Sequence, residues 1–257
     1  MRKKIAAGNW KMHTTLEEGK QLISALINGI EENPPKQTPE EMLVVLGTPF
    51  VTLESAVNLT KNHPQIKVSA QNCYKEEKGA FTGEISAPMI RSTGADYVII
   101  GHSERREYFA ESHATLAKKV DLTLKYGLIP IFCCGEKLEI REKNGHFDLV
   151  KRQIAESLFH LDPESFAKVV IAYEPVWAIG TGVTASPEQA QEMHAFIRNL
   201  LAEKYGAPAA QNTTILYGGS VNAKNARELF SQQDVDGGLV GGASLKADEF
   251  LTIIHSF

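Results

Sequence analysis

Eight short runs rich in Val, Ile and Leu recur along this chain, with longer segments of helical pattern between them. Most runs are almost continuously apolar, as in Tyr97-Val98-Ile99-Ile100, which is typical of strands covered on both faces in a parallel sheet. Eight strand–helix alternations predict an α/β fold, a (β/α)8 barrel of parallel strands surrounded by helices. The runs centre on residues 4–8, 43–47, 66–70, 97–101, 128–133, 169–173, 213–217 and 235–240.

Two of the intervening segments have clear helix boundaries. Ser186 is a good N-cap, Gln189 completes a capping box with it, and Gly206 is expected to end that helix. A second helix is expected to follow Ser112, with Gly127 as its stop. Because no proline- or serine-rich linker divides the 257 residues, we expect one barrel domain over residues 1–257.

Composition excludes several classes of function. The chain carries 27 Lys and Arg against 31 Asp and Glu, a net charge of −4 with the signs interleaved, which argues against nucleic acid as a partner. No apolar run approaches the ~20 residues of a membrane helix, and no signal-peptide core follows the basic start, so we expect no membrane partner and a cytoplasmic protein. Cys73, Cys133 and Cys134 are unpatterned and the eight histidines are scattered, which disfavours a bound metal.

In a (β/α)8 barrel the reactive groups lie where strands end and the following loops begin. Five of the eight predicted strand ends carry residues suited to chemistry. The first is followed by Asn9 and Lys11, the fourth by His102, the sixth by Glu174, and the last two by glycine pairs. These side chains are therefore expected to meet at one end of the barrel.

Glu174 ends a nearly all-apolar strand. Partial burial there would raise the pKa of its carboxyl group toward the range that a general base needs. A glutamate before proline can equally be a solvated turn residue. The eleven uncharged residues after it lack a helical period and suit a lid that excludes water from a ligand. This predicted lid comprises Pro175, Val176, Trp177, Ala178, Ile179, Gly180, Thr181, Gly182, Val183, Thr184 and Ala185.

The glycine-rich turns 218–220 and 241–242 expose backbone N–H groups, and Ser220 adds a hydroxyl. Short helices are expected to start at Asn222 and Ser244, so the two turns together predict a cradle for a phosphate monoester. Glycines that merely permit tight turns are the alternative.

His102 and Lys11 are candidates for opposing an oxyanion. His102 immediately precedes a predicted helix, whose N-terminal N–H groups disfavour an imidazolium and leave a neutral ring that can donate a hydrogen bond. Lys11 is the strand-end cation that could face both the oxyanion and the phosphate. A structural histidine and a surface lysine are the alternative interpretations.

The chain resembles the triosephosphate isomerase family over essentially its whole length. The stretch 172–182, Ala-Tyr-Glu-Pro-Val-Trp-Ala-Ile-Gly-Thr-Gly, is the strongest of the matching motifs. The others lie at residues 8–11, 70–73, 79–86, 101–106, 217–221 and 237–245.

The resemblance implies a cofactor-free enzyme that interconverts dihydroxyacetone phosphate and D-glyceraldehyde 3-phosphate, a step of glycolysis and gluconeogenesis. It implies that Glu174 is the base and His102 the electrophile, with Asn9 and Lys11 binding substrate and Glu104 pairing with Lys11. It also implies phosphate contacts from Gly180, Ser220, Gly241 and Gly242.

The family resemblance further implies a homodimer. The segment from Gln71 to Ser86 would form the contact, with Thr82 reaching toward Asn9 and Lys11 of the other subunit. By the same resemblance, Glu84 and Arg105 would pair across the interface. A self-contained surface loop is the alternative for this segment.

Two other functions remain open on the residues themselves. Lys11 could be the nucleophile of a Schiff-base aldolase that acts on a sugar phosphate. The barrel could also be a non-catalytic protein that binds phosphorylated metabolites, since fold does not determine function.

Overall fold

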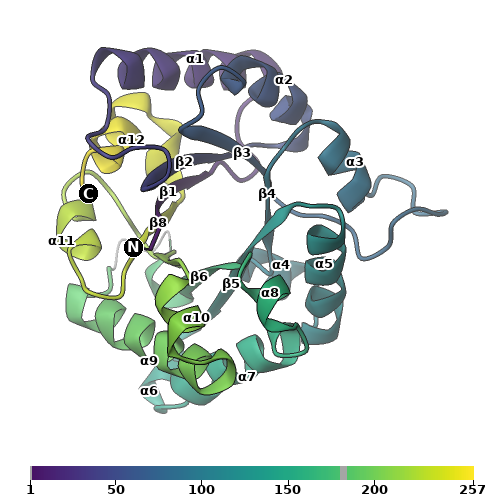
Figure 1. The fold of residues 1–257 in the computed structure, drawn as a ribbon, viewed down its shortest axis with the longest axis vertical. Helices are drawn as coiled ribbons and strands as arrows, with labels where there is room; N and C mark the ends of the chain where they lie inside the picture. The colour runs from purple at the N-terminus through teal and green to yellow at the C-terminus, as the bar shows by residue number, and fades with distance from the viewer. Residues whose placement is uncertain (1, 180–183) are drawn as a thin grey trace.

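Eight parallel strands close into a barrel in the computed structural model, which describes residues 2–179 and 184–257 (Figure 1). Each strand pairs with its neighbours in chain order, and β1 pairs with β8 to close the ring. The prediction of a (β/α)8 barrel is confirmed. The strands are β1 (Lys4–Asn9), β2 (Met42–Gly47), β3 (Ile66–Ala70), β4 (Tyr97–Ile100), β5 (Ile129–Glu136), β6 (Val170–Pro175), β7 (Ile215–Tyr217) and β8 (Gly237–Val240).

Helices ring the strands (Figure 1). They are α1 (Leu16–Glu32), α2 (Phe50–Thr60), α3 (Ala87–Ser92), α4 (Ser103–Tyr108), α5 (His113–Lys125), α6 (Leu138–Glu142), α7 (His146–Leu158), α8 (Pro163–Phe166), α9 (Pro187–Tyr205), α10 (Ala207–Asn212), α11 (Ala226–Phe230) and α12 (Ala247–Ile254), with the 3-10 turns η1 (Val176–Ala178) and η2 (Gly242–Leu245).

The predicted helix boundaries of α5 and α9 are confirmed. The Ser186 hydroxyl accepts a hydrogen bond from the Gln189 backbone, the Gln189 side chain returns one to Ser186, and Gly206 ends the helix at a φ of 87°. Ser112 caps α5 through the backbone of Thr115. Gly127 follows that helix at a φ of 68°, a conformation that favours glycine.

Strands buried on both faces build two apolar layers. Alternate residues of the strands, such as Ile5, Ala7, Val170 and Ala172, form one cluster inside the barrel. The residues between them, such as Ile171, pack outward against the helices in a larger cluster. This two-sided burial explains why the strand sequences are apolar throughout.

Two helix starts predicted in the phosphate cradle are wrong. The side chain of Asn222 accepts hydrogen bonds from the backbones of Lys224 and Asn225, and this turn delays α11 until Ala226. Ser244 lies inside the 3-10 turn η2, where its hydroxyl donates to the carbonyl of Gly241 at 2.7 Å.

The predicted lid also differs from expectation where the structure describes it. Pro175 completes β6, and residues 176–178 form the turn η1 instead of an aperiodic segment. Gly180, Thr181, Gly182 and Val183 lie outside the described residues.

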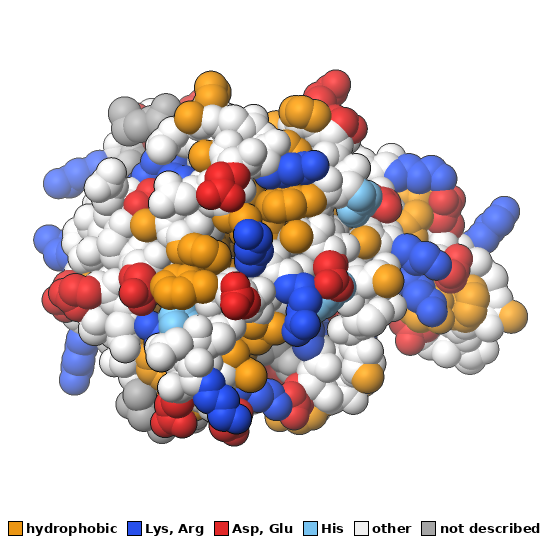
Figure 2. All heavy atoms as spheres, turned by 90° about the horizontal axis from the view of Figure 1, so that it is seen from below, with side chains coloured by type: hydrophobic (Ala, Val, Ile, Leu, Met, Phe, Trp, Pro, Cys, Tyr) orange, Lys and Arg blue, Asp and Glu red, His pale blue; other side chains and the backbone are white. Residues whose placement is uncertain are grey.

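On the face shown in Figure 2, positive and negative side chains are interspersed. The chain between β3 and α3 projects beyond the ring of helices (Figure 1). Among the described residues, no helix combines the length and apolarity needed to span a membrane.

Candidate active site

The alternation of side chains along the strands brings several predicted site residues to the mouth of the barrel. Glu174 lies two residues after Ala172, and Asn9 two residues after Ala7, both members of the interior cluster. Since side chains two apart share one face of a strand, both polar groups continue the inner face at the carboxyl ends of their strands. This is the end at which β/α barrels carry their active sites.

Glu174 and His102 contact each other there. The Nε2 atom of His102 lies 2.9 Å from Oε1 of Glu174, and the backbone N–H of Ser103 donates to Oε2 at 3.0 Å. Glu174 is 1% exposed and His102 6% exposed. Strand β6 and the first turn of α4 thus hold the predicted base beside the predicted electrophile.

Hydrogen bonding assigns the tautomer of His102. This residue caps α4, and its Nδ1 atom accepts a hydrogen bond from the backbone N–H of Glu104 at 3.2 Å. A ring nitrogen that accepts carries no proton, so a neutral ring has its proton on Nε2. Nε2 is the nitrogen that faces the inside of the site.

Two opposing effects act on the protonation of His102. Burial lowers the pKa of the imidazole, whereas the adjacent Glu174 carboxylate raises it through its charge and a hydrogen bond. The net pKa is above its ordinary value. The Glu174 carboxylate makes the largest contribution to the raised pKa, and the charge of Glu104 adds to it.

Lys11 is held in an unusual backbone conformation, with a φ of 52°. Its backbone N–H donates to Oδ1 of Asn9 at 3.0 Å, which helps to maintain this left-handed turn. Its Nζ atom lies 2.6 Å from Oε1 of Glu104, so the expected pairing is present. A Cβ placed on Gly241 would lie 3.7 Å from the Cε atom of Lys11, so the lysine stem passes close to the last glycine turn.

One cavity of about 110 Å³ joins these groups to the glycine turns. The predicted site residues that line it are Asn9, Lys11, His102, Glu174, Ser220, Gly241 and Gly242. Gly180, predicted to bind phosphate, lies outside the described residues. Glu104 is not among the described residues that line this cavity, but it contacts two that do: Lys11 through the ion pair and His102 through the backbone hydrogen bond.

The predicted interface residues lie apart from this cavity. Thr82 and Glu84 are exposed in the projecting segment. Nε of Arg105 pairs with Oε1 of Glu111 of the same chain at 2.7 Å. Glu84 and Arg105 line a neighbouring cavity that also includes Lys11.

Sequence reasoning missed the end of β5 as part of the site. Glu136 is 1% exposed, and its Oε1 atom accepts hydrogen bonds from Tyr173 and Trp177, each at 3.0 Å. It thereby ties the start of the predicted lid to the barrel. The sequence could have indicated Glu136, because it is a carboxylate at the end of an apolar strand, the same pattern that identified Glu174.

No metal centre is evident within residues 2–179 and 184–257, where no three His, Cys, Asp or Glu residues are grouped to hold an ion. The three cysteines are free and buried. Burial and the nearby Glu174 carboxylate raise the pKa of the Cys133 thiol, which keeps it protonated.

Comparison with known proteins gives one family. The sequence profile described as triosephosphate isomerase matches residues 4–257, a span that includes all eight strands. Relatives with this description are 56% identical over 257 residues in Cytophaga hutchinsonii and 55% identical over 260 residues in Porphyromonas gingivalis, each covering 100% of both chains. A third, from Flavobacterium johnsoniae, is 52% identical over 254 residues and covers 99% of both chains.

Proposed function

This chain belongs to the triosephosphate isomerase family and is an isomerase, and from that premise we propose how its residues interconvert dihydroxyacetone phosphate and D-glyceraldehyde 3-phosphate. One observation carries the proposal. The buried carboxylate of Glu174 lies 2.9 Å from the imidazole of His102, at a cavity that also contains Lys11 and two glycine turns.

Glu174 acts as the base. Its carboxylate takes a proton from the carbon next to the substrate carbonyl, the electrons of that C–H bond form the C=C bond of an enediolate, and the carbonyl oxygen becomes an oxyanion. The hydroxyl proton on the carbon that was deprotonated then moves to the oxyanion, which places the negative charge on the other oxygen. That oxygen forms the new carbonyl as the C=C electrons take the proton back from the carboxyl at the former carbonyl carbon, and this completes the exchange of ketone and aldehyde. A positioned acid–base group of this kind contributes about 10²- to 10⁴-fold to the rate.

His102 and Lys11 stabilise the oxyanion. Nε2–H of the neutral imidazole donates a hydrogen bond, and the ammonium of Lys11 supplies a positive charge. Because Glu174 and His102 touch, substrate must separate them before either can act. Burial favours the neutral ring, and that separation removes the Glu174 contact, the largest of the interactions that raise the pKa of His102.

The substrate phosphate binds at the opposite side of the cavity. Ser220, Gly241 and Gly242 line the cavity there, their turns offer backbone N–H groups to an anion, and Lys11 is the lysine that lines the same cavity. A Cβ placed on Gly242 would meet no atom of the described residues within 4 Å, so these residues leave room for a ligand at this turn.

The start of the predicted lid is suitably placed to exclude water from the enediolate, which would otherwise lose its phosphate. Ile179 lines the cavity, and the indole N–H of Trp177 donates a hydrogen bond to Glu136. These contacts support the proposal that residues 176–179 take part in covering the bound substrate.

The aldolase alternative is less well supported. Schiff-base formation requires Lys11 to attack as a free amine. Its Nζ atom is instead engaged in an ion pair with Glu104 at 2.6 Å. Trapping with borohydride after addition of a sugar phosphate would reveal any covalent adduct on this lysine.

A coupled assay with D-glyceraldehyde 3-phosphate tests the function directly. We expect turnover accompanied by exchange of the substrate's α-proton with solvent deuterium. A protein that binds triose phosphates but exchanges no proton would instead be a binding protein on an inherited barrel.

We also propose that the chain forms a homodimer through residues 71–86. Met12 is 97% exposed, and Tyr108 and Phe109 are exposed beside it around a cavity of about 570 Å³ that also includes Lys11. A second copy could cover this apolar surface with its projecting segment, bringing Thr82 toward Asn9 and Lys11 and pairing Glu84 with Arg105. Sedimentation of the wild type and of Met12→Glu tests this, because the charge should favour the monomer.

A further inference from the structure

Strand β5 continues past the point at which its neighbour β4 ends. The β4–β5 pairing stops at Ile100 and Phe132, whereas β5 remains paired with β6 as far as Glu136 and Pro175. The last residues of β5 therefore face no strand on the β4 side. Buried backbone groups without a strand partner must find others, because leaving them unpaired is costly.

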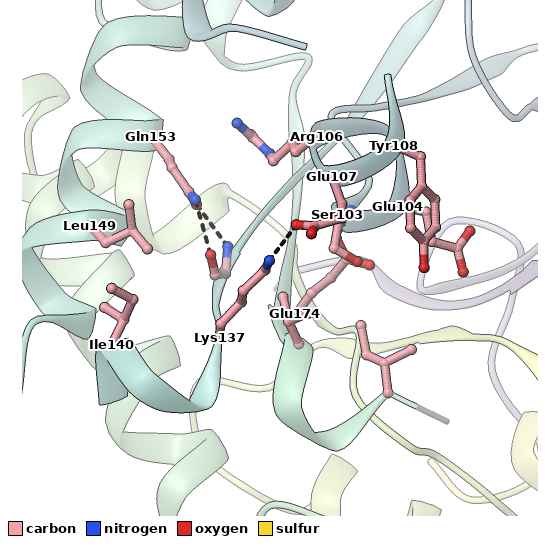
Figure 3. A pocket seen from close by; sticks show the side chains of 13 residues that line it. Ser103, Glu104, Arg106, Glu107, Tyr108, Lys137, Ile140, Leu149, Gln153 and Glu174 are labelled. Carbon is pink, nitrogen blue, oxygen red and sulfur yellow. Dashed lines mark hydrogen bonds and ion pairs between the residues drawn. The ribbon is translucent and has the colours of Figure 1, made fainter. Parts of the chain in front are cut away.

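Two side chains provide those partners. Nη2 of Arg106 donates to the carbonyl of Cys133 at 2.7 Å. The carboxamide of Gln153, on α7, binds Gly135 twice: its Oε1 accepts from the backbone N–H at 2.8 Å, and its Nε2 donates to the carbonyl at 2.9 Å (Figure 3). Gln153 thus occupies the place that a β4 peptide group would take.

The residue that Gln153 holds lies directly against Glu174. Gly135 is opposite Glu174 in the β5–β6 register. A Cβ placed on Gly135 would be 1.7 Å from the backbone carbonyl oxygen of Glu174, so the two backbones touch. Gln153 is 5% exposed and lines the same cavity of about 480 Å³ as Glu174 (Figure 3).

We propose that Gln153 is a positioning residue for Glu174, acting through the backbone of Gly135. This inference rests on the proposed role of Glu174 as the base. The amide holds the extension of β5 in place, and that extension supports the segment of β6 from which the carboxylate reaches Ser103 and His102. Within the described residues, the hydrogen bonds of the Gln153 carboxamide go to Gly135 and not to Ser103 or His102.

Losing the amide should change turnover more than binding. Gln153→Leu leaves the N–H and the carbonyl of Gly135 without partners, so this end of β5 shifts toward the adjoining cavity and Glu174 moves with it. The phosphate contacts lie on the turns after β7 and β8 and are unaffected. Since a displacement of about 1 Å can cost 10²-fold in rate, we expect kcat to fall by roughly 10- to 100-fold while KM stays within about twofold.

Val150→Ala is the matched control. Val150 lies on the same helix, is fully buried in the outer core and does not line the cavity. Its truncation destabilises the packing of α7 without touching Gly135. We expect this variant to lower the thermal midpoint and leave kcat unchanged.

Gln153→Glu tests the hydrogen bonds themselves. An ionised carboxylate can accept from the Gly135 N–H but repels its carbonyl, whereas a protonated carboxyl both accepts and donates as the amide does. The ratio of its kcat to that of the wild type should therefore rise toward one as pH falls. Measuring the wild type at each pH corrects for the titration of Glu174 and His102 that both proteins share.

A normal kcat in Gln153→Leu, or a pH-independent ratio in Gln153→Glu, would overturn the inference. If Gln153→Leu does not fold, the pH dependence of the kcat ratio for Gln153→Glu still tests the positioning role. The role of Glu174 is judged separately by Glu174→Gln: if that change abolishes turnover while both Gln153 variants remain fully active, only the positioning role fails.

Discussion

The Nε2 atom of His102 and the Oε1 atom of Glu174 lie 2.9 Å apart, and both side chains are almost fully buried. The two groups proposed to move a proton and to stabilise an oxyanion therefore form a single unit. Any change that displaces one of them alters the environment of the other, and this coupling underlies the first two predictions.

Glu174→Gln should reduce kcat by about 10²- to 10⁴-fold, because an amide cannot accept the substrate proton. Binding of inorganic phosphate should change little, since the carboxylate acts on carbon. Steady-state kinetics and calorimetric titration with phosphate measure the two effects. Equal losses of turnover and phosphate affinity would contradict the role of Glu174 as a base.

Gly218→Ala should lower turnover through Glu174. A Cβ at Gly218 would lie 2.8 Å from Cγ of Glu174, too close to be accommodated without movement of that side chain. We expect kcat to fall by roughly 10- to 100-fold, the effect of a small misplacement. Gly145→Ala is the control, because a Cβ there meets Ile140 at an ordinary 3.5 Å. Equal kcat values for the two variants would rule out the crowding of Glu174.

Ser220→Ala should mainly weaken binding. A hydrogen bond to a charged phosphate contributes about 1.5 kcal/mol or more, so KM should rise roughly tenfold. Competitive inhibition by inorganic phosphate should weaken in parallel. A variant with normal KM and reduced kcat would show that the phosphate binds elsewhere in the cavity.

His194 should make the protein less stable in acid. Burial lowers the pKa of this imidazole to about 4 from an ordinary value of 6.5. Between these two pKa values the unfolded chain binds a proton that the folded protein does not. The contribution of His194 to the free energy of unfolding is therefore complete above the ordinary pKa of 6.5. It is lost progressively as pH falls toward the lower one, at about 1.4 kcal/mol per pH unit.

Urea unfolding of the wild type and of His194→Gln across this pH range tests whether the stability contribution of His194 falls in acid. The difference in unfolding free energy between the two proteins should shrink as pH falls. A difference that is constant, or that grows in acid, would show that His194 is not held neutral in the folded state.

Much of the fold could be predicted because its signals are local. Continuous apolar runs identified all eight strands, and the caps Ser112 and Ser186 marked helices at the observed residues. The position of Glu174 at the end of the sixth apolar run also predicted that it lies at the barrel mouth, and the structure shows it on the inner face formed by Val170 and Ala172.

Predictions were wrong where side chains compete with the expected backbone pattern. Asn222 forms its own turn and delays α11, and Ser244 binds the carbonyl of Gly241 inside a 3-10 turn. Both residues are good helix starters by type. The type of a residue does not specify which of its possible local hydrogen bonds will form.

The sequence by itself determined the order of strands and helices, the closed barrel that this order favours, and the strand ends at which polar residues collect. Only the tertiary structure decided that β4 is too short to pair with the end of β5, and that Gln153, 18 residues after Gly135, takes the vacant place. Periodicity reflects the geometry of one segment. The contact between Gln153 and Gly135 depends on the lengths and register of neighbouring strands, which are settled only when the barrel closes.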